Sequence, residues 1–200
     1  MSQGAIKSEL LRNKQVQLFP GEYHVATGEV ILSTLLGSCV AACLYDPIHQ
    51  IVGMNHFMLA NSGYPKTSPG LLADAGRYGI HAMELLVNKM LKCGALKKEI
   101  RAKVFGGGNV LSSLNGSSNF GSIGDINVRF IQEFLKKERI PLIAADLGGE
   151  QGRVIHFSSK DYSVHVRKVK STVTKKVSNN ELNFLAHSVK KNLKTTSELF

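Results

Sequence analysis

The chain has 200 residues, a formal net charge of +10 at pH 7 and 43% hydrophobic residues, which suits one globular domain with a sizeable core. Its three cysteines cannot all pair and form no Cys-x-x-Cys motif, which argues against a disulfide scaffold or a zinc knuckle and for a reducing compartment. No apolar run approaches the roughly 18 residues of a membrane span, and the N-terminus lacks a signal peptide, so we expect a cytoplasmic protein.

Strand-like runs dominate the first third of the chain. Residues 1–20 are polar and mixed, so we expect an N-terminal arm there and a main domain over 21–170. Asp46-Pro47 makes a turn between two of the runs, which predicts a hairpin. Residues 61–70 are rich in turn formers and predict a loop. The predicted strands are Tyr23–Thr27, Val30–Leu35, Val40–Tyr45 and Ile51–Leu59.

Two helices are predicted further along the chain. The first runs from Leu71 to Lys92, where apolar residues recur at helical spacing and Gly94 follows as a C-cap. The second runs from Asp125, a good N-cap, to Glu138. The remaining predicted strands are Ala102–Phe105, Pro141–Asp146, Arg153–Ser158 and Ser163–Val169.

Short connections between most neighbouring strands favour antiparallel pairing. We therefore predict an α/β fold in layers, with a mixed, largely antiparallel sheet flanked by helices, and not a doubly wound nucleotide fold. The basic tail over 171–200 includes a candidate helix, because Ser178-x-x-Glu181 forms a capping box before an apolar stripe. The tail is interpreted as a solvated extension, and the alternative is docking on an acidic surface or anionic lipid.

The most informative stretch is Leu36–Val40 (Leu-Gly-Ser-Cys-Val), which places Cys39 behind a Gly-Ser turn at the head of an apolar run. A thiol becomes a good nucleophile as thiolate, and a neighbouring imidazole is the usual way to form one. Backbone amides beside Cys39 are placed to serve as an oxyanion hole. The alternative is a buried cysteine that acts as a small hydrophobe, which is the better interpretation for Cys43.

His56 is the candidate base for this cysteine. It shares a strand face with three apolar residues, so a buried core histidine is one interpretation. The Asp46-Pro47 hairpin, however, returns this strand alongside the one that starts at Cys39, and its register brings His56 near that start. The other histidines have no comparable cysteine partner and are expected at the surface or in packing: His24, His49, His81, His156, His165 and His187.

A third group should orient the imidazole. Ser33 and Thr34 lie in the preceding strand and carry hydroxyls that can do so, although both residue types are common in strands. Gly106-Gly107-Gly108-Asn109 lacks the Gly-Lys-Ser/Thr ending of a phosphate loop, so we expect a turn that brings backbone close to the active site. No spacing of His, Asp or Glu predicts a metal centre.

Five blocks in chain order resemble the CheD family of chemoreceptor glutamine deamidases, over residues 21–169. The blocks are Leu36–Val40, Asp46-Pro47, Gly53–Leu59, Phe105–Asn109, and Asp146–Gly149 with Gly152-Arg153. The resemblance implies a fold shared with bacterial toxin deamidases and no dissociable cofactor. It also implies hydrolysis of selected glutamine carboxamides on methyl-accepting chemotaxis receptors, with release of ammonia. Some members bind the CheY-phosphate phosphatase CheC, which makes a CheC-type phosphatase a candidate partner.

The resemblance also implies roles for single residues. By motif, Cys39 would be the nucleophile and His56 the base. The family's third catalytic position, a threonine six residues before the cysteine, falls on Ser33, and Thr34 next to it is the substitute. Three further residues are expected at the substrate or the oxyanion: Gly37, Ser38 and Asn55.

Other functions are weighed against this one. A non-catalytic adaptor on the same fold would bind receptors or a phosphatase, but it has no use for both Cys39 and His56. A nucleic-acid binder is suggested only by the charge, and the chain lacks aromatics interleaved on a basic face. A related amidase or esterase would use the same cysteine chemistry on another leaving group.

Overall fold

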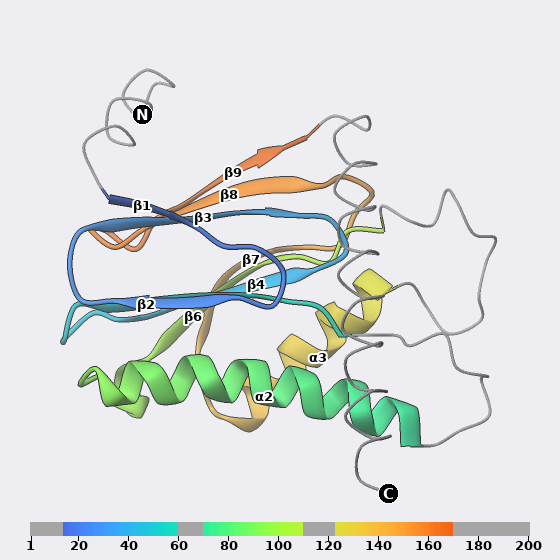
Figure 1. Cartoon of the computed structure of the whole chain (residues 1–200), viewed down its shortest axis with the longest axis horizontal. Coiled ribbons are helices and arrows are strands. Elements are labelled where there is room, and N and C mark those ends of the chain that lie inside the picture. Colours follow the sequence, from blue (N-terminus) through green and yellow to red (C-terminus); the bar gives the residue numbers. More distant parts are fainter. Residues whose placement is uncertain (1–13, 60–69, 110–122, 170–200) are drawn as a thin grey trace, which may run out of the picture.

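In the part of the chain that the structure describes, two stacked β-sheets and two α-helices form the layers (Figure 1). A computed structural model describes residues 14–59, 70–109 and 123–169. Sheet A has the order β1 (Lys14–Gln17), β3 (Val30–Leu36), β8 (Arg153–Ser158), β9 (Val164–Lys168). Sheet B has the order β2 (Tyr23–Ala26), β5 (Ile51–Phe57), β4 (Val40–Asp46), β6 (Arg101–Gly106), β7 (Leu142–Leu147). Helices α2 (Gly70–Lys92) and α3 (Ile123–Lys137) pack on sheet B, and the 3-10 turn η1 (Lys97–Glu99) follows α2.

The central strand β4 separates two apolar layers because its side chains point alternately to opposite faces of the sheet. Val40 and Leu44 face the layer beneath α2 and α3, whereas Ala41 and Cys43 face the layer between the two sheets. Every residue of β4 and of β5 is buried. This burial on both faces accounts for the nearly continuous apolar sequence of the two strands.

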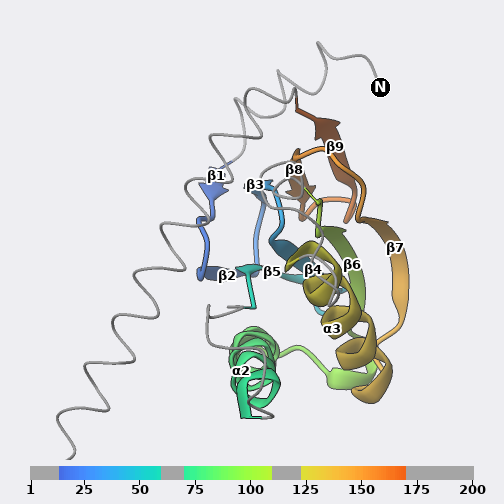
Figure 2. The same ribbon diagram turned by 90° about the vertical axis from the view of Figure 1, so that its right-hand side faces the viewer.

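The predicted layered α/β fold is confirmed, and antiparallel pairs predominate. Only β1–β3 and β6–β7 are parallel among the strand pairs of the described residues. The sequence did not reveal that the strands divide between two sheets. The helices cover the face of sheet B that points away from sheet A (Figure 2).

Two predicted boundaries differ from the structure. The N-terminal arm expected over 1–20 is wrong in its last part, because Lys14–Gln17 forms β1 beside β3. This short polar strand lies at the edge of sheet A, where it pairs with one neighbouring strand, β3. Helix α3 begins at Ile123, two residues before the Asp125 expected as its N-cap.

Parts of the sequence-based predictions lie outside the described residues. They are the loop over 61–69, the tail over 171–200 with its candidate helix, and the first 13 residues of the arm. Within the ranges that the structure does describe, no helix is long and apolar enough to cross a membrane.

The turns that matter most gather at one end of the sheets, which we call the loop end. The end of β3 meets the start of β8, and the start of β4 meets the ends of β5 and β6. The end of β7 joins them through its pairing with β6. This end lies at the right of Figure 1 and faces the viewer in Figure 2.

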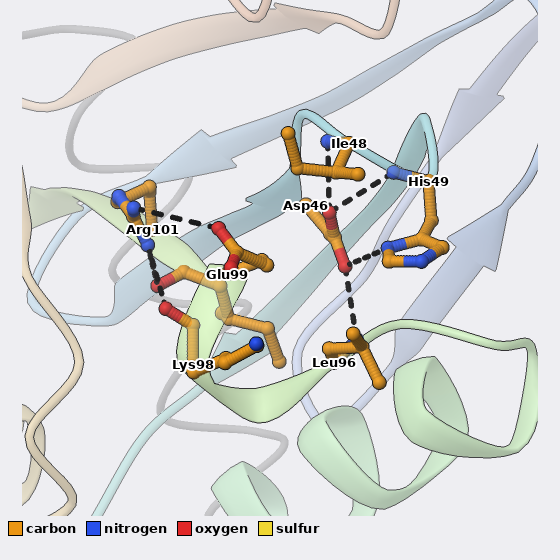
Figure 3. Close-up of polar contacts among 8 residues, drawn as sticks. Asp46, Ile48, His49, Leu96, Lys98, Glu99 and Arg101 are labelled. Carbon is orange, nitrogen blue, oxygen red and sulfur yellow. Dashed lines mark hydrogen bonds and ion pairs between the residues drawn. The ribbon is translucent and has the colours of Figure 1, made fainter.

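At the opposite end of the β4–β5 hairpin, the buried carboxylate of Asp46 organises the turn (Figure 3). It accepts backbone hydrogen bonds from Ile48 at 2.9 Å, His49 at 3.0 Å and Leu96 at 2.9 Å, and it lies 2.8 Å from His49 Nδ1. Burial alone would raise the pKa of Asp46, but these hydrogen bonds outweigh it and lower the pKa below 3.8. The carboxylate thus ties the hairpin to the chain that leaves α2.

We expect Asp46→Ala to lower the free energy of unfolding by about 2–4 kcal/mol, because it removes the buried acceptor of several hydrogen bonds that hold the turn. Since the folded-state pKa is lowered, the stabilisation by Asp46 is present at neutral pH and is lost as the pH falls through that pKa. Urea unfolding at pH 7 and at decreasing pH measures both effects. Asp161→Ala, at an exposed turn aspartate bonded to Ser163, is the control, with an expected loss below about 1 kcal/mol. Equal losses for the two variants would contradict the role of Asp46.

Candidate active site

The turn between β3 and β4 carries Cys39, which is fully buried. The Gly37 carbonyl accepts a hydrogen bond from the Gly108 N–H at 2.8 Å, and the Cys39 carbonyl accepts one from the Gly107 N–H at 2.7 Å. The backbone on both sides of the cysteine is therefore fixed by the end of β6.

Glycine at positions 106 and 107 allows these two segments to approach. Gly106 has a φ of +115°, and a Cβ added there would lie 2.2 Å from the Cys39 carbonyl oxygen. Gly107 has a φ of +66°, and a Cβ there would lie 2.3 Å from Val128 of α3. Both positions require glycine for conformation and for space. The prediction that this glycine-rich turn brings backbone close to the cysteine is confirmed.

His56 lies on β5 beside the start of β4. Its register partner is Ala41, so Cys39 is its diagonal neighbour on the same face of sheet B. Diagonal neighbours are about 7–8 Å apart at the backbone, within reach of a long side chain. The hairpin register expected from the Asp46-Pro47 turn is thus confirmed, and both side chains enter the layer between the sheets.

Thr34 of β3 reaches across from sheet A to the ring of His56. Its Oγ1 lies 2.8 Å from His56 Nδ1 and donates to the Leu18 carbonyl at 2.8 Å. A carbonyl can only accept, so the single hydroxyl proton of Thr34 is used there. Towards His56 the hydroxyl must then accept, which places a proton on Nδ1 and leaves the Nε2 lone pair as the basic site.

The main chain of His56 is also held. Its N–H donates to the Glu22 carbonyl at 2.9 Å, and its carbonyl accepts from the Gly21 N–H at 2.8 Å. The turn that supplies these groups also supplies the Leu18 carbonyl to Thr34. Beside it opens a hollow of about 350 Å³ lined by Val16, Gln17, Leu18, Gly21, Glu22, Tyr23 and His24. His56 is therefore fixed at ring and backbone next to a concave surface.

Ser33, the first choice for the orienting hydroxyl, points to the other face of β3. Its Oγ lies 2.8 Å from His156 Nδ1 and accepts from Gln15 Nε2 at 3.1 Å. Adjacent strand residues face opposite ways, so only one of the two hydroxyls can reach His56. The expectation for Ser33 is corrected: the structure brings its substitute, Thr34, to the imidazole.

Asn55, expected at the substrate or the oxyanion, faces away from the cysteine. Its Oδ1 accepts from the Ala42 N–H at 3.1 Å, and its Nδ2 donates to the Ala82 carbonyl of α2 at 3.3 Å. The side chain is buried and braces sheet B against the helix. This expectation is also corrected, because the residue next to His56 in the chain necessarily points to the opposite face.

Cys43 lies on the same face as Cys39, four residues further along β4. Burial raises the pKa of its thiol, and the charge of Lys103 acts weakly in the other direction. Cys43 is therefore a protonated, inert packing residue, as expected. Among the described residues, no group of three or more His, Cys, Asp and Glu side chains could hold a metal ion.

The glycine-rich turn over 146–152 is hydrogen-bonded to the glycine-rich turn over 106–109. The Gly148 N–H donates to the Gly106 carbonyl at 2.9 Å, and the Asn109 N–H donates to the Gly149 carbonyl at 2.7 Å. The buried guanidinium of Arg153 bonds to the Gly148 carbonyl and pairs with the Asp146 carboxylate at 2.8 Å. Arg153 therefore fixes the shape of the 146–152 turn, whose backbone bonds to the 106–109 turn that in turn holds the Cys39 segment.

Comparison with known proteins places this arrangement in a family. A family model described as "CheD chemotactic sensory transduction" matches residues 58–168. A probable chemoreceptor glutamine deamidase CheD 1 of Geobacter sulfurreducens is 49% identical over 174 residues, covering 87% of each chain. A probable CheD 2 of Shewanella oneidensis is 50% identical over 151 residues, covering 75% of this chain and 74% of its own. The chain belongs to the CheD family.

Solved structures add little to this assignment. A Neisseria meningitidis protein of the family DUF152 aligns with a TM-score of 0.41 at 11% identity, over 74% of this chain and 67% of its own. At that distance the likeness does not bear on the function of a CheD protein.

One residue of this CheD site escaped the sequence analysis. Asn127, in the second turn of α3, is fully buried and hydrogen-bonds to the Ser38 carbonyl beside the cysteine. An asparagine near a helix start is usually a solvent-exposed or capping residue. The sequence around Asn127 therefore does not indicate this contact. Gly37 and Ser38, by contrast, directly precede Cys39 in the turn. Their contact with substrate stays a prediction.

We expect Gly106→Ala to lower the free energy of unfolding by about 2–4 kcal/mol, because the new methyl group meets the Cys39 carbonyl and the φ is unfavourable for alanine. Denaturant unfolding monitored by circular dichroism measures the loss. Gly28→Ala is the matched control, since a Cβ there meets nothing within 4 Å, and its effect should stay within about 0.5 kcal/mol. A Gly106→Ala protein as stable as the control would show that the two segments have room to separate.

Proposed function

We propose that this CheD protein deamidates glutamine side chains of methyl-accepting chemotaxis receptors to glutamate, with Cys39 as the nucleophile and His56 as the base. The curated relatives bear the name of chemoreceptor glutamine deamidase. The observation that carries the proposal is the Thr34–His56 hydrogen bond at 2.8 Å, on the face of sheet B that Cys39 shares. It supplies an oriented imidazole beside a cysteine, which is what thiol-dependent amide hydrolysis requires.

The mechanism follows from the protonation state of His56. Nε2 takes the Cys39 proton, and the thiolate attacks the glutamine Cδ, which moves the carbonyl electron pair onto oxygen. Backbone N–H groups near Cys39 stabilise that oxyanion. The protonated imidazole then gives its proton to the departing nitrogen, and ammonia leaves with formation of a thioester. Water, activated by His56, cleaves the thioester to glutamate and restores the thiol.

Thr34 keeps the imidazole in the productive tautomer throughout this cycle. Because its hydroxyl proton is committed to the Leu18 carbonyl, it accepts from Nδ1 whether the ring is neutral or protonated. The role corresponds to that of the orienting acid in a hydrolase triad, without a negative charge.

The substrate glutamine belongs to a protein, so the site must admit a folded surface. The turns that surround Cys39 lie at the loop end, and the hollow lined by residues 16–24 lies beside the turn that holds the backbone of His56. A CheC-type phosphatase is a second candidate partner, which the family resemblance implies. The chemistry described for Cys39 and His56 requires no dissociable cofactor.

We expect Cys39→Ala to abolish deamidation, because the variant has no nucleophile. Receptor cytoplasmic fragments are incubated with each protein, and mass spectrometry follows the gain of about one dalton per glutamine converted to glutamate. Cys43→Ala is the control, since Cys43 is a buried packing cysteine of β4, four residues after Cys39, and it should retain activity where folded. Conversion that survives Cys39→Ala would exclude Cys39 as the nucleophile, and a Cys39→Ala protein that still binds receptors would leave the adaptor role intact.

We expect Thr34→Val to lower kcat by about 100-fold with little change in KM, near the lower end of what a positioned acid–base group contributes. The substitution preserves shape but removes the acceptor for His56 Nδ1. Thr34→Ser should restore most of the activity, since it keeps the hydroxyl. Ser33→Ala is the neighbouring control and should leave kcat close to wild type, because Ser33 bonds to His156 instead. Loss of activity in Ser33→Ala but not in Thr34→Val would reverse the assignment.

A further inference from the structure

Asn127 of α3 uses both ends of its carboxamide at the cysteine turn. Its Nδ2 donates to the Ser38 carbonyl at 2.8 Å, and its Oδ1 accepts from the Leu59 N–H at 2.8 Å. The side chain is fully buried. One amide group therefore joins the residue before Cys39 to the chain that continues from the His56 strand.

The hairpin register shows which contact Asn127 replaces. The last strand pair is Val40–Phe57, so Ser38 and Leu59 face each other two positions further on. In an antiparallel ladder every second pair exchanges main-chain hydrogen bonds directly. Because it lies two positions away, the Ser38–Leu59 pair has the same place in this alternation as the Val40–Phe57 pair, so both are bonded pairs or both are non-bonded pairs.

The intervening pair decides between these two cases. His56 directs its N–H and its carbonyl to the turn before β2 and not to β4. The Ala41–His56 pair is therefore a non-bonded pair of the hairpin, and the pairs on either side of it are the bonded ones. A regular ladder would continue with a direct hydrogen bond from the Leu59 N–H to the Ser38 carbonyl. The carboxamide of Asn127 stands in its place and keeps the two chains apart.

Three successive carbonyls of the cysteine turn are thereby held. Those of Gly37 and Cys39 accept from the backbone of the 106–108 turn, and that of Ser38 accepts from Asn127, the one side chain among the three donors. A trans peptide directs its N–H opposite to its carbonyl. The Cys39 N–H therefore points away from the Asn127 carboxamide and away from β5.

We propose that Asn127 is a positioning residue that keeps the Ser38–Cys39 peptide out of the β-ladder, so that the Cys39 N–H stabilises the oxyanion. The inference rests on the proposed role of Cys39 as nucleophile. When the sulfur–carbon bond forms, the carbonyl π-electron pair moves to oxygen, and a donor held in advance lowers the barrier because it does not need to reorganise. A displacement reaction at saturated carbon develops no such charge on a carbonyl oxygen and gains nothing from this donor.

Two reagents at the same sulfur separate the effects. Acylation of Cys39 by p-nitrophenyl acetate passes through an oxyanion, whereas alkylation by chloroacetamide does not. Both rates are measured on the full chain by peptide mass spectrometry, which separates Cys39 from Cys43 and Cys93, with Cys39→Ala as the background. We expect Asn127→Ala to slow acylation by about 10-fold relative to alkylation, less than the loss of a whole oxyanion donor. Asn127→Ser is measured in parallel in case the alanine variant does not fold.

Asn55→Ala is the matched control. Asn55 is likewise a buried asparagine that joins sheet B to a helix, but it does not contact the cysteine turn. Its acylation-to-alkylation ratio should stay within about twofold of wild type, since it leaves the oxyanion donor in place. An unchanged ratio in both Asn127 variants, or equal losses in both reactions, would overturn the proposal. A wild-type protein that acylates rapidly but leaves receptor fragments unmodified would refute the proposed substrate and not the role of Asn127.

Discussion

The hydrogen bond between Thr34 and His56 connects the two sheets, and the proposed chemistry depends on it. Sheet A supplies the hydroxyl and sheet B supplies both the imidazole and the cysteine. Neither sheet alone carries a complete site. A displacement of one sheet over the other would change the Thr34–His56 contact but not the register of the β4–β5 hairpin within sheet B. The apolar packing around Leu32, Met54 and Phe157 between the sheets therefore supports the proposed site, because it fixes the separation of the two sheets.

The sequence allowed the local hairpin to be predicted but not the contacts between sheets. The Asp46-Pro47 turn and the apolar runs on either side of it set the register of Cys39 and His56, because that register is local. The choice between Ser33 and Thr34 required knowing which face of β3 meets sheet B. Nothing local decides this, since both residues carry a hydroxyl and both faces of β3 are buried.

Long-range contacts at the cysteine turn were equally hidden. Asn127 lies 89 residues from Ser38 in the chain, and its sequence neighbourhood is that of an ordinary amphipathic helix. The four mostly polar residues of β1 show no hydrophobic periodicity, so the sequence predicts an arm at this position and not a strand. By contrast, the positive φ values of Gly106 and Gly107 agree with what a glycine run predicts, because only the backbone is involved. Prediction succeeded where backbone conformation or local pairing decided the outcome, and it failed where a distant side chain did.

The hydroxyl pair on β3 also bears on how the strand finds its register during folding. A slip of β3 by one residue would turn Ser33 towards His56, so a hydroxyl would still face the imidazole. The same slip would carry Leu32 and Leu36, both fully buried, out of the layer between the sheets. Ile31 and Leu35 would take their places, so the layer would stay apolar but would have to repack around side chains of different shape, at a cost of up to about 1.5 kcal/mol for each exchanged side chain. The packing of the leucines, far from any reacting group, therefore favours the register in which Thr34 faces His56.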